Sequence, residues 1–176
     1  MTSDNATTAP NRHGSAVVTL PSDTEILITR TFDAPADLVF KAYTTPDLVR
    51  RWWGFETSEW VTCDIDLRVG GTWRFVTKEA NGMEVGFHGE YREIDRPHRL
   101  VATEAFEGVP DPDANAALNI LTLAESDGAT TLSLLCRYPD QQTRDMVVAS
   151  GMEGGLQVSY NRLEDLVAGK GEVLSE

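Results

Sequence analysis

The sequence predicts an α+β protein, in which a curved antiparallel sheet of about six to seven strands wraps around a long C-terminal helix. Three observations lead to this fold class: two short helical segments follow the first strands, short β-rich runs joined by tight turns fill the middle, and a helical pattern closes the chain. A sheet and a helix that each have one apolar face bury those faces against each other. Such a pairing commonly encloses a cavity that suits a small apolar ligand.

The chain of 176 residues is short enough for one domain. Residues 1–15 are small, polar and turn-forming, so we expect a disordered N-terminal tail. Residues 16–170 are expected to form the single domain, and residues 171–176 a C-terminal tail.

The sequence pattern of the first part of the domain predicts a strand and then two short helices. The run EILITRTF places alternate side chains on opposite faces, as a strand does. The segment Asp33-Ala34-Pro35 opens a helix, because proline is favoured in the first helical turn. Thr45-Pro46-Asp47 ends that helix and starts a second one, which carries RRWW and ends at Gly54.

The middle of the chain reads as a meander of strands. Glycine-containing turns separate β-rich runs at Gly70-Gly71, Asn81-Gly82 and Asp127-Gly128. Because no helical pattern lies between these runs, neighbouring strands are expected to be antiparallel.

The last helical pattern extends from about Asp140 to Val167. Its apolar positions step by three and four residues, which is the spacing of one helix face. Gly151, Gly154 and Gly155 interrupt it, and each costs roughly 1 kcal/mol relative to alanine in a helix interior. They would either thin the helix where it faces a cavity or permit close contact with the sheet.

Composition narrows the classes of partner. A formal net charge of -13 disfavours nucleic acid and anionic membranes, since both attract basic surfaces. No apolar run approaches the ~18 residues of a membrane span, and the N-terminus lacks the apolar region of a signal peptide. We therefore expect a cytoplasmic protein, with Cys63 and Cys136 as reduced thiols in the core.

Catalytic and metal-binding motifs are sparse. The three histidines are far apart without metal-ligand spacing, and no motif indicates a cofactor. His88 and Glu90 share one face of a strand and could form an acid/base pair if that face lined a cavity. Alternation favours the opposite, apolar face of Phe87 and Tyr91 inside, although a bulge at a neighbouring glycine would reverse the order.

Four segments carry a resemblance to a known family. They are RTFDAPADLVFKAYTTPDLVRRWWG, DLRVGGTWRF, FHGEYREIDRPHRLVAT and GMEGGLQVSYNRLEDLV, and together they extend over about residues 25–167. The chain resembles the SRPBCC (START-like, helix-grip) superfamily, in particular proteins similar to the C-terminal domain of the heat-shock-protein-90 ATPase activator. The resemblance implies the helix-grip fold and a cavity between its sheet and last helix.

This resemblance also points to a difference in the cavity. Relatives usually carry tryptophan at the positions of Met152 and Leu156, so the smaller or more flexible side chains here would admit different ligands. Chaperone activators of this kind carry a separate N-terminal domain, whereas about fifteen polar residues precede the fold here.

The leading functional hypothesis is non-enzymatic binding of a small hydrophobic or amphipathic molecule. Its expected ligand-binding residues are those that could line the sheet–helix cavity: Trp53, Trp73, Phe75, Phe87, Tyr91, Phe106, Met152, Gly155 and Leu156. One alternative is an enzyme of the cyclase or hydrolase kind that uses His88 and Glu90. Another is a module that contacts a chaperone and activates its ATPase; a homodimer is also left open.

The adjacent tryptophans at 52 and 53 need separate roles. Side chains of consecutive helical residues point ~100° apart, so both cannot face the core. We expect one to plug the seam between helix and sheet and the other to border the cavity mouth, with Arg50 and Arg51 directed outward.

Overall fold

Eight antiparallel strands form one sheet in the computed structural model, which describes residues 12–168. The order across the sheet is β1-β2-β8-β7-β6-β5-β4-β3. The strands are β1 (Val17–Thr19), β2 (Glu25–Phe32), β3 (Glu59–Ile65), β4 (Thr72–Lys78), β5 (Glu84–Asp95), β6 (Arg99–Phe106), β7 (Ala117–Ser126) and β8 (Ala129–Arg137). The α+β class and the antiparallel meander are confirmed. The strand number is higher than the expected six to seven, and short β1 pairs with β2 at one edge.

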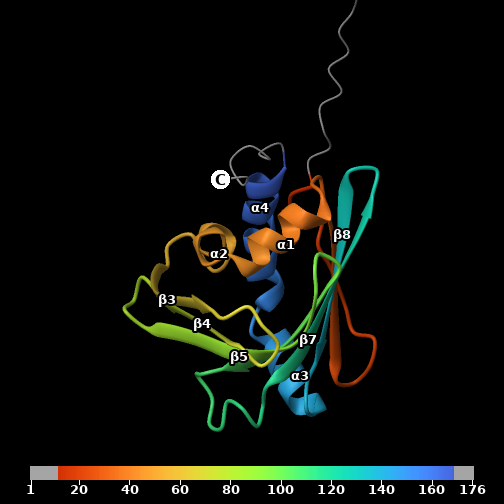
Figure 1. Cartoon of the computed structure of the whole chain (residues 1–176). Helices are drawn as coiled ribbons and strands as arrows, with labels where there is room; N and C mark the ends of the chain where they lie inside the picture. Colours follow the sequence, from red (N-terminus) through yellow and green to blue (C-terminus); the bar gives the residue numbers. More distant parts are fainter. Residues whose placement is uncertain (1–11, 169–176) are drawn as a thin grey trace, which may run out of the picture.

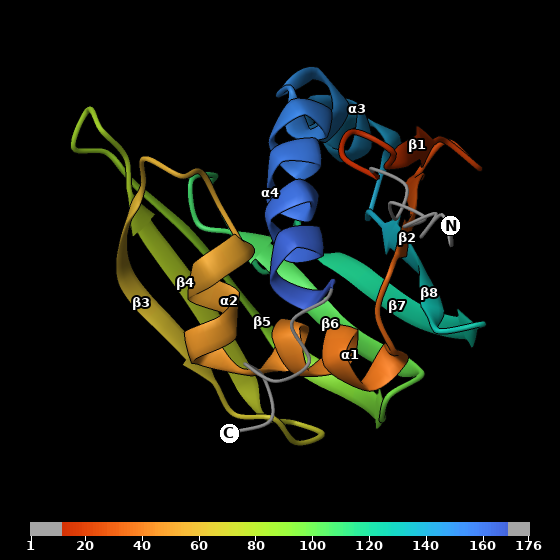
Figure 2. The same ribbon diagram turned by 90° about the horizontal axis from the view of Figure 1, so that it is seen from above.

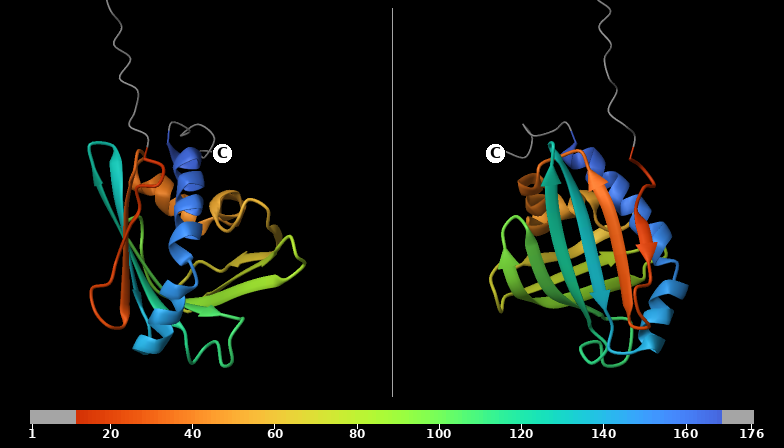
Figure 3. Two further views of the ribbon diagram at one scale, coloured as in Figure 1. Left: turned by 180° about the vertical axis from the view of Figure 1, so that it is seen from behind. Right: turned by 90° about the vertical axis from the view of Figure 1, so that its right-hand side faces the viewer.

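Four helices lie on one side of this sheet: α1 (Ala36–Thr44), α2 (Pro46–Trp52), α3 (Gln141–Ala149) and α4 (Met152–Val167). Helix α4 crosses the concave face, while α1 and α2 lie beside it (Figures 1 and 2). The right-hand view of Figure 3 shows the sheet in front and the helices behind it. The concave face is therefore bordered by both the sheet and the helices.

Alternation decides which side chains face α4. In β2 the residues at 26, 28, 30 and 32 are buried and those between them are half-buried, as period two requires. The register aligns Ile26 with Cys136 and Cys136 with Asn119 across three neighbouring strands. Residues of one such row point to the same face of the sheet.

The expected single C-terminal helix is instead two helices. Asp140 caps α3 by accepting a hydrogen bond from the Thr143 backbone at 2.7 Å, and α3 ends at Ala149. Gly151 then has φ of +79°, a left-handed conformation that glycine adopts without steric penalty. The chain changes direction there, so the three glycines do not share one role.

The core lies between the sheet and the helices. Tyr160 and Leu163 on α4 are at most 1% exposed and pack with Phe32 and Phe40. The ring of Phe32 meets that of Tyr160 edge-on at a centroid distance of 5.7 Å. Such contacts fix α4 against the sheet near its C-terminal half.

Both chain ends of the described part contact the domain. Residues 12–15 belong to the predicted tail, yet Arg12 pairs with Asp33 at 2.9 Å and the Gly14 backbone donates to Asn161 on α4 at 2.8 Å. The remaining tail predictions, at 1–11 and 171–176, lie outside the described residues. Within residues 12–168, no helix combines the length and apolar character needed to cross a bilayer.

Candidate functional site

The two adjacent tryptophans diverge because α2 ends between them. Trp52 is the last helical residue, whereas Trp53 has an extended backbone and Gly54 follows with φ of +82°. Trp52 is 3% exposed, and its indole nitrogen donates to the Ala42 carbonyl at 2.9 Å. It packs on Tyr43 and Tyr160, so it fills the space between helices rather than a helix–sheet seam.

Trp53 joins a continuous group of rings on the inner face of strands β3 to β6. Its centroid lies 5.3 Å from that of Phe75 and 5.5 Å from that of Phe87, both in edge-to-face geometry. Phe87 in turn stacks on Phe106 at 5.2 Å. We call this group the aromatic wall; its members are Trp53, Trp60, Trp73, Phe75, Phe87 and Phe106.

A second surface comes from the first half of α4. We call Met152, Gly155 and Leu156 the helical wall, and its two large side chains are partly buried against the core. A Cβ at Gly155 would lie 3.5 Å from the ring of Phe55, which is an ordinary contact, and Phe55 is 56% exposed. Gly155 is therefore not a point of close helix–sheet contact.

Exposure separates the nine predicted ligand-binding residues. Trp73, Phe75 and Tyr91 are 7%, 8% and 4% exposed, so they support the surface from within the core. Trp53, Phe87, Met152, Gly155 and Leu156 are half-buried, and Phe106 is 41% exposed. The structure thus brings five of the nine together in the aromatic wall and three in the helical wall, with Tyr91 beneath them.

A polar cluster interrupts the apolar inner face next to these walls. Glu104 on β6 and Asn119 on β7 point to the α4 side, as their rows with Ala117, Ala102 and Cys136 show. The negative charge of Glu104 adds to the effect of burial in raising the pKa of four neighbouring groups, so all four lie within electrostatic reach of it. They are Tyr43, Cys136, Tyr138 and Tyr160. The polar cluster therefore consists of Glu104, Asn119, Cys136, Tyr138, Tyr43 and Tyr160.

Glu104 is the unusual member of this cluster. Burial raises its pKa to about 7, and a hydrogen bond from Asn119 only partly opposes that shift. The side chain nevertheless keeps some solvent-accessible surface. The residue is therefore half-buried as a whole, while protein surrounds its carboxyl group closely enough to raise the pKa. The other amide atom, Asn119 Oδ1, is buried without a hydrogen-bond partner.

The hydroxyl groups of Tyr43 and Tyr160 bond to each other at 2.6 Å, which joins α1 to α4 above the sheet. Burial is the main cause that raises the pKa of both phenols. Burial also raises the pKa of the Cys136 thiol. Cys63 and Cys136 are both free and buried, as expected from the sequence.

His88 lies on the opposite face of β5 from Phe87, away from α4. Its Nδ1 is 2.9 Å from Glu107 and its Nε2 is 2.6 Å from Asp113, and these partners raise its pKa against a smaller effect of burial. Glu90 instead lies 3.7 Å from Arg92. The structure does not bring His88 and Glu90 together as a pair, and neither belongs to the two walls.

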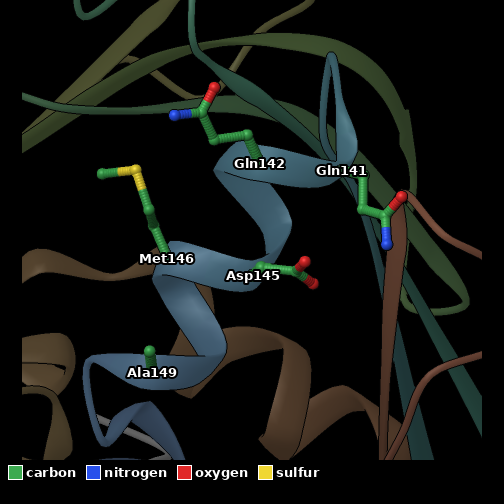
Figure 4. Close-up of a pocket in the computed structure, with 5 residues that line it drawn as sticks. All are labelled: Gln141, Gln142, Asp145, Met146 and Ala149. Atoms are coloured by element: carbon green, nitrogen blue, oxygen red, sulfur yellow. The ribbon is translucent and has the colours of Figure 1, made fainter.

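A hollow of about 550 Å³ lies against one face of α3. Only residues of that helix line it: Gln141, Gln142, Asp145, Met146 and Ala149. In Figure 4, Gln142 and Met146 project to one side of the helix and Gln141 and Asp145 to the other. Because one helix supplies its whole lining, this hollow is an open surface depression. None of the nine predicted ligand-binding residues lines it.

No group of three or more histidine, cysteine, aspartate or glutamate side chains in the described part of the chain is placed to hold a metal ion. The chemistry available at the walls is therefore apolar contact, ring stacking and hydrogen bonding through the polar cluster.

Sequence reasoning missed the polar cluster although a signal existed. In HRLVATEAFE, Glu104 occupies the same period-two face as Leu100, Ala102 and Phe106. Asn119 interrupts the face of Ala117 and Leu121 in the next strand. Polar residues on the buried face of two neighbouring strands indicate a site or a satisfied pair in the core.

Comparisons with known proteins agree with this geometry. A family model described as Activator of Hsp90 ATPase homolog 1-like protein matches residues 33–168. A search of the curated proteins finds no match to the chain.

Solved structures of bacterial proteins share the fold. A protein from Rhodobacter sphaeroides is 25% identical with a TM-score of 0.78, and covers 86% of this chain and 97% of its own. A protein from Mycobacterium smegmatis is 24% identical with a TM-score of 0.77, covering 88% and 98%. One from Chromobacterium violaceum is 25% identical with a TM-score of 0.72, covering 84% and 99%.

Proposed function

We propose that this chain, which belongs to the family of activator of Hsp90 ATPase homolog 1-like proteins, has a binding role. It binds a small molecule with an apolar body between the aromatic wall and the helical wall. The role is one of binding rather than catalysis. The observation that carries the proposal is the incomplete burial of Trp53, Phe87, Phe106 and Leu156 around one part of the concave face. Large apolar side chains gathered at an accessible surface mark binding sites.

The polar cluster supports the same location. Glu104 is surrounded by enough protein to raise its pKa to about 7, yet it keeps accessible surface. This carboxyl group lies on the inner face of the sheet, in the same row as Ala117 on the neighbouring strand. An apolar lining with a few polar groups is the usual composition of a small-molecule site.

Helix α4 supplies the specificity of this proposed site. The partly buried Met152 and Leu156 occupy the positions where, by the resemblance noted in the sequence, relatives carry tryptophan. Smaller side chains leave more room beside Phe55 and the aromatic wall, and Gly155 adds none of its own bulk.

Filling this room tests the proposal. The variant Leu156→Trp should weaken binding of 1-naphthalenemethanol at least tenfold by isothermal titration calorimetry, because the indole takes the ligand's place. Val158→Trp is the matched control, since Val158 on the same helix is 43% exposed and outside both walls. Equal affinity of L156W and wild type, or no binding of any apolar probe by the wild type, would refute the proposal.

A chaperone contact is a second candidate, and the specific observation in its favour is the family match over residues 33–168. Its test is the ATPase rate of the host's Hsp90-type chaperone at a large excess of this protein. An increase would support the contact, and an unchanged rate would exclude activation.

A further inference from the structure

The polar cluster contains hydrogen-bonding capacity that the chain does not use. Asn119 Oδ1 is buried and has no donor. Glu104 receives a hydrogen bond from Asn119, and a carboxylate has acceptor sites for several more. Buried acceptors without partners are rare in folded proteins, because each one loses its hydrogen bonds to water. The shortage at this point of the fold is one of donors.

Within residues 12–168, no side chain donates a hydrogen bond to Asn119 Oδ1. The hydroxyl groups of Tyr43 and Tyr160 bond to each other at 2.6 Å, which uses the proton of one of them. The Cys136 thiol and the Tyr138 hydroxyl are near enough to affect each other's pKa, although burial is the main cause that raises both. A bound molecule that carries N–H or O–H groups would supply the donor that Asn119 Oδ1 lacks in the described part of the chain.

A positive charge that would pair with Glu104 is also missing from the polar cluster. In the described part of the chain, burial and Asn119 are the only causes that shift the pKa of Glu104, so no cation acts on it. The guanidinium of Arg30 approaches the backbone of Tyr160 and donates to its carbonyl, and it lies 3.8 Å from Glu164. An unpaired buried carboxylate is stabilised strongly by a cation that also donates hydrogen bonds.

The cluster adjoins the aromatic wall. Phe106 lies two residues after Glu104 on the same face of β6 and stacks on Phe87. Two residues along a strand span about 7 Å. A molecule whose polar head reaches Glu104 can therefore lay an aromatic or aliphatic body of one or two rings on Phe106 and Phe87.

We propose that Glu104 and Asn119 recognise the head group of the ligand, and that this head group is a protonated amine on an apolar body. This inference rests on the proposed binding function. An ammonium group provides the positive charge that faces Glu104 and enough N–H donors for both the carboxylate and Asn119 Oδ1. The formal net charge of -13 also attracts cationic molecules to the protein.

Three probes that share one apolar body test the head group: 1-naphthylmethylamine, 1-naphthalenemethanol and 1-naphthoic acid. At pH 8 the wild type should bind the amine at least tenfold more tightly than the alcohol, and the acid most weakly, by isothermal titration calorimetry. Glu104→Gln should reduce the preference for the amine over the alcohol to less than threefold. Glu84→Gln removes one carboxylate from the exposed start of β5 and should leave that preference unchanged.

The pH dependence gives a second readout. Raising the pH from 6 to 8 ionises Glu104, whose pKa is about 7, so the amine should bind more tightly while the alcohol is unaffected. The groups that interact electrostatically with Glu104, from α1, β7, the end of β8 and α4, are Tyr43, Asn119, Cys136, Tyr138 and Tyr160. Their tyrosine and cysteine pKa values are all raised, so these side chains stay neutral in that range.

The outcomes separate this inference from the proposal beneath it. If the wild type prefers the amine and E104Q does not, the result supports both the apolar binding site and the amine head group. Binding of the alcohol with no preference for the amine, or a preference that E104Q retains, overturns the amine head group and leaves the apolar site standing. Failure of the wild type to bind any of the three probes overturns both. Binding of the alcohol by E104Q also shows that this variant is folded.

Discussion

The role of Glu104 was not predicted, although its position in the sequence shows a polar residue on an apolar strand face. Its position on an otherwise apolar strand face was visible, but a solvated edge and a buried site give the same period-two pattern. What distinguishes them is the packing of α1 against α4 and over the neighbouring strands β7 and β8, which comes from residues far away in the chain. His88 shows the converse, because alternation alone favoured its outward direction and the structure places it opposite Phe87.

Replacing Glu104 by glutamine is expected to stabilise the protein at pH 8 and to change little at pH 5. The folded-state pKa of about 7 exceeds the ordinary value of 4.5, so stability is lost as pH rises through 7 and the carboxyl ionises in a buried place. A shift of this size corresponds to a few kcal/mol, on the order of 3, in the free energy of unfolding. Urea denaturation at both pH values measures it.

The exposed Glu84→Gln serves as the control for this measurement, since its carboxyl group is not desolvated. Equal effects of E104Q at pH 5 and pH 8 would show that Glu104 is not desolvated in the folded state.

At the scale of elements, local signals predicted most of the helices and strands. Pro35, Pro46 and the glycine turns set boundaries that the structure confirms within a few residues. A C-terminal helix is confirmed, but its continuity from about Asp140 to Val167 was wrongly predicted, because apolar periodicity continues through Gly151 even though the backbone there is left-handed. The members of the aromatic wall were largely predictable from strand alternation, whereas the separate destinations of Trp52 and Trp53 depend on where α2 ends.

Two glycine replacements near this break should have opposite effects. Gly151→Ala should lower the free energy of unfolding by about 1 kcal/mol, because a Cβ strains the backbone at φ of +79°. Gly154→Ala should raise it by up to about 1 kcal/mol, since no atom lies within 4 Å of the new Cβ and alanine favours the helix. Chemical denaturation compares the two variants. Stabilisation by G151A would show that α3 and α4 can join as one helix.

For the whole molecule, the two faces of the sheet carry different chemistry. The outer face holds charged groups such as Arg74, His88 and Glu107, and the inner face holds the core, the walls and the polar cluster. The left-hand view of Figure 3 shows the β3–β5 half of the sheet bending away from α4, which is the side of the aromatic wall. The helix-grip arrangement therefore leaves incompletely buried apolar side chains on the inner face of a strongly acidic protein.

The pKa values of Glu104 and Glu107 are shifted in opposite directions, and together they are expected to set the pH of maximum stability. The hydrogen bond from Arg74 lowers the pKa of Glu107 to about 2, so its contribution is present above pH 4.5 and is lost as pH falls toward 2. Burial raises the pKa of Glu104 to about 7, so stability declines as pH rises from 4.5 through 7. Urea midpoints measured across pH should therefore be highest near pH 5. A maximum at pH 8 or above would contradict this balance.

The crystal structure of the protein with 1-naphthalenemethanol tests the central claim most directly. We expect the naphthalene ring between the aromatic wall and the helical wall, in contact with Phe87 and Leu156, with its hydroxyl group toward Glu104 and Asn119. A ring seated in the hollow on α3, or on the outer face beside His88, would contradict the account.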